Sequence, residues 1–227
     1  MMMQQAGGGL PDYIQDGLVL WLDGIEKGNN AGTWTDLASG NIFTYNDVNH
    51  CIELKNGVQF DGQGWASCPN DNISYNYRDH TIEVVCRSIA YGSIINELPI
   101  FTTGRSGQIC AMFSIEDSFK KAYYASNTWT STYNLGTVHI EPIDLKSAQM
   151  NYSRALLNGH RTTEMIGASV ISQTIKPDAY IARYFGGSWD GKYNGIIHSL
   201  RVYNRTLSFE EMEYNSDIDN RRFNFGL

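Results

Sequence analysis

The chain has 227 residues, of which 42% are hydrophobic, 12% aromatic and 18% charged, and this length lets one domain bury roughly 70% of its unfolded surface without a disulfide or a metal. Its formal net charge is −7, and Lys or Arg residues are adjacent only at Lys120-Lys121 and Arg221-Arg222. These properties exclude nucleic acid and an anionic membrane surface as partners, because both require a basic patch.

The N-terminal residues 1–11 include the run Gly7–Gly9 and lack both the basic start and the apolar core of a secretion signal. We expect this segment to form a flexible, glycine-rich arm. Residues 12–227 show one composition throughout and no internal repeat, which predicts a single domain. No segment approaches the roughly 20 apolar residues of a membrane span, so we expect no membrane insertion.

The first half of the chain predicts short strands joined by turns. Residues 17–24 are apolar on both faces, which is typical of a central strand in a sandwich. Lys55-Asn56-Gly57 lies between two apolar runs and predicts a β-hairpin. Ile82, Val84 and Cys86 occupy alternate positions and define one face of a further strand. The strands expected in this half are 17–24, 51–54, 58–61 and 81–87.

The second half continues this pattern up to residue 185. Asn158-Gly159 predicts a tight turn, and residues 120–133 form the most aromatic part of the chain. The strands expected here are 99–103, 108–115, 135–141, 148–157 and 179–185. No helical period long enough for crossover connections separates them, which excludes a parallel α/β sheet and predicts an all-β protein.

The last part of the chain predicts two turns and a strand. Asp190-Gly191 and Asn194-Gly195 have the composition of turns that require positive φ. Residues 196–203 then alternate, as a strand with two different faces does. One face is expected to carry Ile196, His198, Leu200 and Val202, and the other Ile197, Ser199, Arg201 and Tyr203.

A short helix is predicted directly after this strand. Ser208 and Glu211 have the spacing of a capping box, in which each side chain bonds the other residue's backbone N–H. Leu207 and Met212 have the spacing of the hydrophobic staple that accompanies such a box. We expect this helix to fold back over the sheet as a lid.

Residues 195–215 contain Gly195, Ile197, Arg201, Tyr203-Asn204-Arg205 and Leu207-Ser208-x-x-Glu211. This pattern resembles the C-terminal signature of laminin G-like domains, which belong to the concanavalin A-like lectin/glucanase superfamily. Four upstream segments are similar to strands of that family and appear in the family's order, at 17–24, 56–62, 81–87 and 155–160. The resemblance implies an antiparallel β-sandwich of the jelly-roll type over residues 12–227, with one short C-terminal helix.

Catalytic motifs are missing from the sequence. A glycosidase needs two carboxylates about 5–10 Å apart, which on one strand face means alternate positions. Glu83 has no such partner on its strand, and Glu116-Asp117 are adjacent, so they face opposite sides of a strand. There is no nucleophile elbow, zinc-protease motif or phosphate-binding loop. We therefore predict that the protein is not an enzyme; a glycoside hydrolase with carboxylates from distant strands is the less favoured alternative.

Loop aromatics are the candidate ligand-binding residues. Tryptophan and tyrosine rings suit sugar binding, because one ring buries a large area at a small cost in entropy. Packing in the core is the competing interpretation for each tryptophan. The candidates are Trp65, Trp129 and Trp189, together with Asn127 and Tyr133.

The family resemblance also implies calcium at one rim of the sandwich, bound by loop oxygens. Asp61 and Asp71 are the candidate ligands, and turn formation is the competing role for both. No cofactor is expected to be required. The four cysteines allow three pairings, and buried free thiols are favoured over a disulfide; they are Cys51, Cys68, Cys86 and Cys110.

These observations predict a non-catalytic recognition module that binds surface glycans in attachment or adhesion. We expect an extracellular protein, on a cell surface or a virus particle, because a virion component needs no signal in this chain. The alternative is a structural or decoration module that contacts other protein subunits of a larger assembly. A large apolar patch on one sheet face would favour that alternative.

Overall fold

The computed structural model describes residues 10–28, 30–69, 80–89, 97–105, 108–116, 121–128, 131–139, 147–150, 154–162, 178–183 and 192–224. For residues 97, 98, 147 and 162, and for the described residues between 104 and 139, it describes the backbone alone. None of the helices in these ranges is long and apolar enough to cross a membrane.

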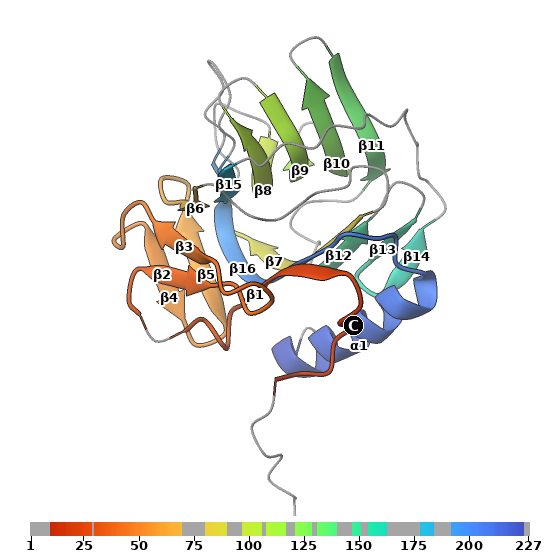
Figure 1. Ribbon diagram of the computed structural model, residues 1–227, viewed down its shortest axis with the longest axis horizontal. Helices are drawn as coiled ribbons and strands as arrows, with labels where there is room; N and C mark the ends of the chain where they lie inside the picture. The colour runs from red at the N-terminus through yellow and green to blue at the C-terminus, as the bar shows by residue number, and fades with distance from the viewer. Residues whose placement is uncertain are drawn as a thin grey trace, which may run out of the picture.

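Two antiparallel sheets lie against each other, and one helix covers the outer face of the first (Figure 1). The sheet under the helix, here the helix-side sheet, has the order β14 (His160–Thr162), β13 (Ala155–Leu157), β12 (Ser147–Met150), β7 (Thr81–Ser88), β16 (Asn194–Tyr203), β5 (Gly57–Asp61) and β4 (Cys51–Leu54), and β1 (Leu18–Asp23) also pairs with β16. The helix is α1 (Phe209–Phe223).

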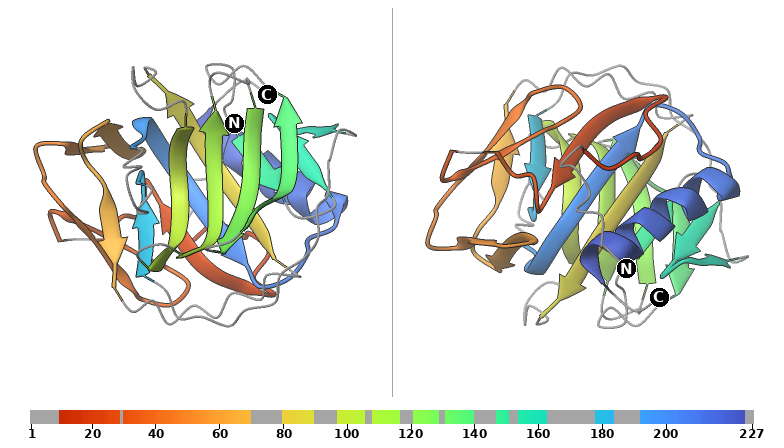
Figure 2. Two further views of the ribbon diagram at one scale, coloured as in Figure 1. Left: turned by 90° about the horizontal axis from the view of Figure 1, so that it is seen from above. Right: turned by 90° about the horizontal axis from the view of Figure 1, so that it is seen from below.

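The second sheet, here the far sheet, has the order β11 (Ser131–His139), β10 (Lys121–Thr128), β9 (Gln108–Glu116), β8 (Glu97–Arg105), β15 (Asp178–Ile181), β6 (Ala66–Cys68), β3 (Ile42–Tyr45) and β2 (Thr33–Thr35). Figure 2 shows the far sheet in front in its left view and α1 in front in its right view. The predicted all-β antiparallel sandwich with one C-terminal helix is thus confirmed.

The main core lies between the sheets and follows the alternation of the strands. Ile82, Val84 and Cys86 of β7 all belong to it, as their spacing predicts. Trp34 is fully buried there, and its indole N–H donates to the carbonyl of Asp23 at 3.0 Å. Two smaller apolar clusters lie on the other face of the helix-side sheet, one of them around Leu207 and Met212.

The strand β1 is less central than the sequence predicts. In the described residues it pairs only with β16, apart from a single bridge between Leu22 and Asp36. Both its faces are nevertheless buried, because Leu20 and Leu22 pack in the main core while Trp21 packs against Tyr13 on the helix side. Two apolar faces therefore indicate that a strand is packed on both sides. They do not show that it lies in the middle of its sheet.

The alternation of β16 is interrupted by a β-bulge between Ile197 and Ser199. The sequence predicts Ile197 on the face of Ser199 and Arg201, but Ile197 packs in the main core together with Leu200. The extra residue is His198, and its ring lies 5.6 Å from the ring of Phe223 at the end of α1. A bulge adds one residue to one strand and so shifts the side chains before it to the opposite face.

The predicted turn at Asn194-Gly195 is also wrong, because both residues lie in β16. Gly195 is needed there for a close approach and not for positive φ. A Cβ at this position would lie 2.5 Å from the Arg87 carbonyl oxygen and 2.5 Å from the Tyr193 hydroxyl. The tight turn predicted at Asn158-Gly159 is confirmed, with φ of 48° and 79°.

The helix α1 begins as its sequence predicts. The Ser208 side chain accepts from the backbone N–H of Glu211, and the Glu211 carboxylate accepts from that of Ser208. Leu207 and Met212 are fully buried in one cluster, which confirms the hydrophobic staple. Acidic residues in the first turn and basic residues in the last turn complement the helix dipole.

Replacing Ser208 with alanine is expected to lower the free energy of unfolding by about 1 kcal/mol, because the Glu211 N–H loses its acceptor. Ser208→Asp keeps an acceptor at the same place and should remain close to the wild type. Urea unfolding of the three proteins checks this. An equal loss in both variants would contradict a capping role.

Candidate binding site at one rim of the sandwich

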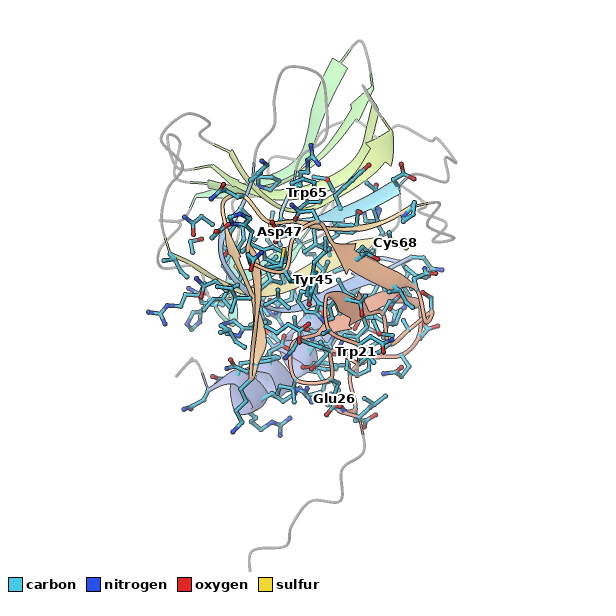
Figure 3. All side chains as sticks on the ribbon, turned by 90° about the vertical axis from the view of Figure 1, so that its left-hand side faces the viewer. Trp21, Glu26, Tyr45, Asp47, Trp65 and Cys68 are labelled. Atoms are coloured by element: carbon cyan, nitrogen blue, oxygen red, sulfur yellow. The ribbon has the colours of Figure 1, made fainter. Side chains whose placement is uncertain are left out.

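Three connections that pass from one sheet to the other meet at one rim. They join β3 to β4, β5 to β6, and β15 to β16. The first two are held together by backbone and side-chain bonds between Asn46 and Trp65. The Trp65 N–H donates to the Asn46 side-chain oxygen at 2.6 Å, and the Asn46 N–H donates to the Trp65 carbonyl at 3.0 Å. Figure 3 shows Trp65 and the neighbouring Asp47 on the same side of the molecule.

A histidine–aspartate pair fixes the same two connections more firmly. His50 Nδ1 lies 2.7 Å from one Asp61 carboxylate oxygen, and the other oxygen accepts from the backbone N–H groups of Gln63 and Gly64. The hydrogen bond with Asp61 raises the pKa of His50 above its ordinary value, and the charge of Lys192 opposes this rise. Gly64 has no room for a side chain, because a Cβ would overlap the His50 carbonyl.

Trp65 is half-buried at this rim, and two basic side chains lie over its ring. The guanidinium carbon of Arg183 is 4.0 Å from the ring centroid, and the ammonium nitrogen of Lys192 is 5.3 Å from it. Both distances are within the range of cation–π attraction. Trp65 is therefore a loop aromatic, as predicted, but its ring already contacts cations.

The backbone around Arg183 adopts an unusual conformation. Ala182 has a φ of 64°, which is unfavourable for a residue with a Cβ. Three bonds hold it: the Ala182 N–H donates to Ile100 O at 2.9 Å, the Tyr193 N–H donates to Ala182 O at 3.0 Å, and the Thr102 hydroxyl donates to Arg183 O at 2.6 Å. A backbone strain that its surroundings enforce is characteristic of positions that place a functional side chain.

The other predicted ligand-binding residues are only partly described. Asn127 and Tyr133 lie on the paired strands β10 and β11, opposite Thr132 and Ser126 respectively, and so at one hairpin. The strands β8 and β9 separate this hairpin from β15, a lateral distance on the order of 14 Å. The structure thus does not bring this pair to Trp65. Trp129 and Trp189 lie outside the described residues, and so does Asp71.

Calcium binding stays a prediction. In the described part of the chain, no three His, Cys, Asp or Glu side chains gather as metal ligands. Asp61 uses its oxygens for His50 and for two backbone N–H groups, which is the turn role that competes with calcium binding.

The cysteines whose side chains are described are buried thiols that are not joined in disulfides, as favoured from the sequence; they are Cys51, Cys68 and Cys86. Burial raises the pKa of the Cys51 and Cys86 thiols to about 12. Both are therefore protonated at neutral pH and unreactive. The side chain of Cys110 lies outside the described residues.

A pair of buried carboxylates lies elsewhere, between the helix-side sheet and α1. Arg201 of β16 is fully buried and donates from Nε to Glu83 at 2.7 Å. Its two terminal nitrogens donate to the two oxygens of Asp219 at 2.9 and 2.5 Å. The pair therefore sits on two edges of one guanidinium.

Further polar side chains complete this buried network. The amide of Asn215 donates to both oxygens of Glu83 and to the Tyr203 hydroxyl, and the Tyr13 hydroxyl donates to Asp219 at 2.7 Å. Glu83 and Asp219 are at most 1% exposed. A substrate has no access to these carboxylates. Their hydrogen bonds instead connect α1 with the helix-side sheet and with the N-terminal segment at Tyr13.

The sequence named Trp65 and Asp61 separately as candidates, and the structure brings both to this rim. Arg183, Lys192 and His50 were not named. Arg183 falls in the strand expected at 179–185 and Lys192 follows the turn expected at Asp190-Gly191. No spacing rule distinguishes such single basic residues from ordinary surface charges.

His50 is three residues from Asp47 and eleven from Asp61. A histidine between two aspartates is a weak sign of an ion pair. The pairing of β4 with β5, which sets Cys51 opposite Phe60, brings Asp61 to His50, so the predicted hairpin at Lys55-Asn56-Gly57 held the signal for this contact.

Comparison with known proteins shows the fold. No family model matches the sequence, and no curated protein matches it either. Among solved structures, a Trypanosoma rangeli sialidase in complex with 2,3-difluoro-KDN is similar, with a TM-score of 0.58 and 15% identity over 91% of this chain and 33% of that one. The binding domain of botulinum neurotoxin DC in complex with SialylT is also similar. Its TM-score is 0.62, and its identity is 12% over 90% of this chain and 51% of that one.

The binding domain of botulinum neurotoxin serotype C1 is similar to the same degree, with a TM-score of 0.60 and 11% identity over 89% of this chain and 52% of that one. The chain thus spans about a third of the sialidase and half of the toxin domains. Identities this low show the fold alone. The protein is an antiparallel β-sandwich whose fold is similar to parts of this sialidase and of these toxin binding domains.

Proposed function

We propose that the protein is a laminin G-like, non-catalytic recognition module that binds surface glycans at the rim around Trp65. Attachment or adhesion at a cell surface or on a virus particle is the proposed setting. The observation that carries the proposal is the half-buried Trp65 on a loop that two further connections hold in place. Binding residues are commonly found on loops that a rigid scaffold positions.

One further observation supports glycans as the ligand class. The similar sialidase and toxin binding domain were solved with sialic-acid-type or sialyl ligands. Since this chain spans only a third to a half of those proteins, their ligands support the class and no particular contact. Glu83 and Asp219 are buried, so this pair is not the carboxylate pair that a glycosidase needs at its substrate.

A glycan array with the purified chain tests the proposal. Trp65→Ala should weaken binding about 30-fold, as the loss of a central aromatic contact does. Tyr214→Ala removes an exposed ring on α1 and is the matched control, with no change expected. Binding that survives Trp65→Ala would place the site elsewhere. No binding on a broad array would overturn glycan recognition in favour of the structural module.

The same array run in calcium and in chelator tests the proposed rim calcium. Loss of binding in chelator, restored by added calcium, supports a rim ion. Equal binding in both conditions overturns the calcium proposal and leaves the role of Trp65 intact.

A further inference from the structure

The helix α1 forms a layer of its own over the helix-side sheet. Figure 2 shows it across the outer face of that sheet in its right view. In the described residues, no side chain of α1 belongs to the main core between the two sheets. Removal of the helix therefore leaves the packing between the sheets intact. The buried residues of α1 are Met212, Asn215, Ser216, Ile218, Asp219 and Phe223.

Two small apolar clusters and one charged network hold α1 on the sheet. Met212 belongs to one cluster and Ile218 to the other. Asn215 and Asp219 belong to the network, which reaches Glu83 of β7. Half of the buried residues of α1 are thus polar, because Ser216 is the third such residue. An interface of this kind is less strongly apolar than the core between the sheets.

Glu83 shares a single cation with another carboxylate. Arg201 of β16 donates from Nε to Glu83 at 2.7 Å and also bonds Asp219 of α1. On the other side of Glu83, its cross-strand neighbour on β12 is the uncharged Gln149. The charged and titratable groups of the network besides Glu83 are Arg201 and Tyr203 of β16, Asp219 of α1 and Tyr13 of the N-terminal segment.

We propose that α1 is a pH-controlled cover, whose local opening from the helix-side sheet increases when Glu83 loses its proton and Arg201 has two carboxylates to neutralise. This inference is independent of glycan binding. The rim around Trp65 is built from the connections between β3 and β4, β5 and β6, and β15 and β16, which contain no part of α1.

The closed position of α1 favours the protonated Glu83 carboxyl. With both carboxylates ionised, one guanidinium leaves the buried network with a net negative charge. Burial raises the pKa of Glu83 from 4.5 to about 7 in the closed protein, whereas a hydrated Glu83 in the open protein titrates near 4.5. The closed protein thus binds the proton more tightly. Its advantage is complete below pH 4.5 and is lost as the pH rises through about 7.

Permanent attachment of α1 is the competing role of the network. In that case the helix leaves the sheet only when the whole domain unfolds. The two roles differ in the surface that is exposed on opening. A local opening exposes little surface, so its free energy depends weakly on urea, whereas global unfolding has the full urea dependence.

Hydrogen exchange of the full chain, resolved by mass spectrometry and measured at pH 6 and pH 8 in low concentrations of urea, tests the proposal. After correction for intrinsic exchange rates, the protection of the α1 amides should be about tenfold lower at pH 8, as the two pKa values require. This protection should depend little on urea. The amides of β7 should be better protected, and their protection should fall steeply with urea.

Glu83→Gln should abolish the pH dependence of α1 protection, because the titrating group is gone. Glu213→Gln is the matched control on the same helix and should keep the tenfold change. Glu213 pairs with Arg161, which lowers the pKa of Glu213, so this carboxylate is ionised at both pH values. If Glu83→Gln fails to fold, Ser216→Cys supplies a second readout.

This second readout uses a position that is 3% exposed beneath the helix. A thiol there reacts with an alkylating reagent only when α1 opens. Its labelling rate, corrected for the thiolate fraction, should rise about tenfold from pH 6 to pH 8. A labelling rate that stays constant after this correction would contradict the cover.

Three results overturn the inference. Equal protection and equal urea dependence of α1 and β7 show that the helix opens only with the whole domain. Unchanged α1 protection between pH 6 and pH 8 rules out control by pH. A pH change that persists in Glu83→Gln assigns that control to another group. None of these results alters the expected loss of glycan binding in Trp65→Ala.

Discussion

Arg201→Ala is expected to lower the free energy of unfolding by about 3–5 kcal/mol, the usual cost of removing one partner from a buried ion pair. Arg201 is fully buried and bonds Glu83 and Asp219. Without Arg201, the buried carboxylates of Glu83 and Asp219 lose the guanidinium that bonds both of them. Urea unfolding at pH 7, followed by tryptophan fluorescence and circular dichroism, measures the loss.

Arg205→Ala is the matched control, because Arg205 also forms a forked pair with a carboxylate, that of Glu211. Its side chain is 26% exposed, against 0% for Arg201, so its loss should amount to only about 1 kcal/mol. Adding Glu83→Gln to Arg201→Ala should recover part of the stability by removing one of the two unpaired charges. Equal losses in Arg201→Ala and Arg205→Ala would contradict a buried, charge-dependent network.

The contribution of Glu83 to the free energy of unfolding is expected to decrease by about 3 kcal/mol as the pH rises from 4.5 to about 7, and to stay at that lower level above pH 7. Burial raises the pKa of Glu83 from its ordinary 4.5 to about 7, against the opposing charge of Arg201. The charge of Asp219, which shares the Arg201 guanidinium with Glu83, adds to this rise in pKa.

The direction of this pH dependence follows from proton binding. The folded protein holds the Glu83 proton more tightly than the unfolded chain, so the contribution is complete below pH 4.5 and disappears as the pH rises through about 7. Glu83→Gln removes this titration but leaves those of His50 and His198. The difference in unfolding free energy between wild type and Glu83→Gln should therefore fall with pH. A difference that rises with pH would show that the Glu83 carboxylate is ionised in the fold.

The local structure could be predicted well from the sequence. Alternation at Ile82, Val84 and Cys86 places them in the core, because a strand turns every second side chain to the same face. The start of α1 also follows from spacing, because capping joins residues within about one turn. Ser208 and Glu211 form the capping box, and Leu207 and Met212 form the hydrophobic staple. Prediction failed at Ile197 and Gly195. A bulge at His198 and a close approach to Arg87 both depend on what the neighbouring strand does.

The candidate site around Trp65 could be predicted only in part. Trp65 was named from its place in a loop, and Asp61 from the family resemblance, which implies calcium at one rim. Arg183 and Lys192 were not named, because their contact with Trp65 joins two different connections. His50 was also missed, although it lies beside the pair Cys51–Phe60 of the predicted hairpin and so next to Asp61. Two of the predicted tryptophans lie outside the described residues, so their part in the rim stays a prediction.

The sequence by itself therefore determined many of the elements that depend on neighbours along the chain: most of the expected strands, two hairpin turns and the capped helix. The strand expected at 148–157 was wrong, because β12 and β13 are two strands that pair antiparallel. Tertiary structure alone decided which charges meet. Glu83 reaches Arg201 across 118 positions and Trp65 meets Arg183 from another connection, although no periodicity links these residues. The physical reason is that backbone periodicity repeats over a few residues, whereas ion pairs and cation–π contacts depend on how whole strands and loops are placed in the sandwich.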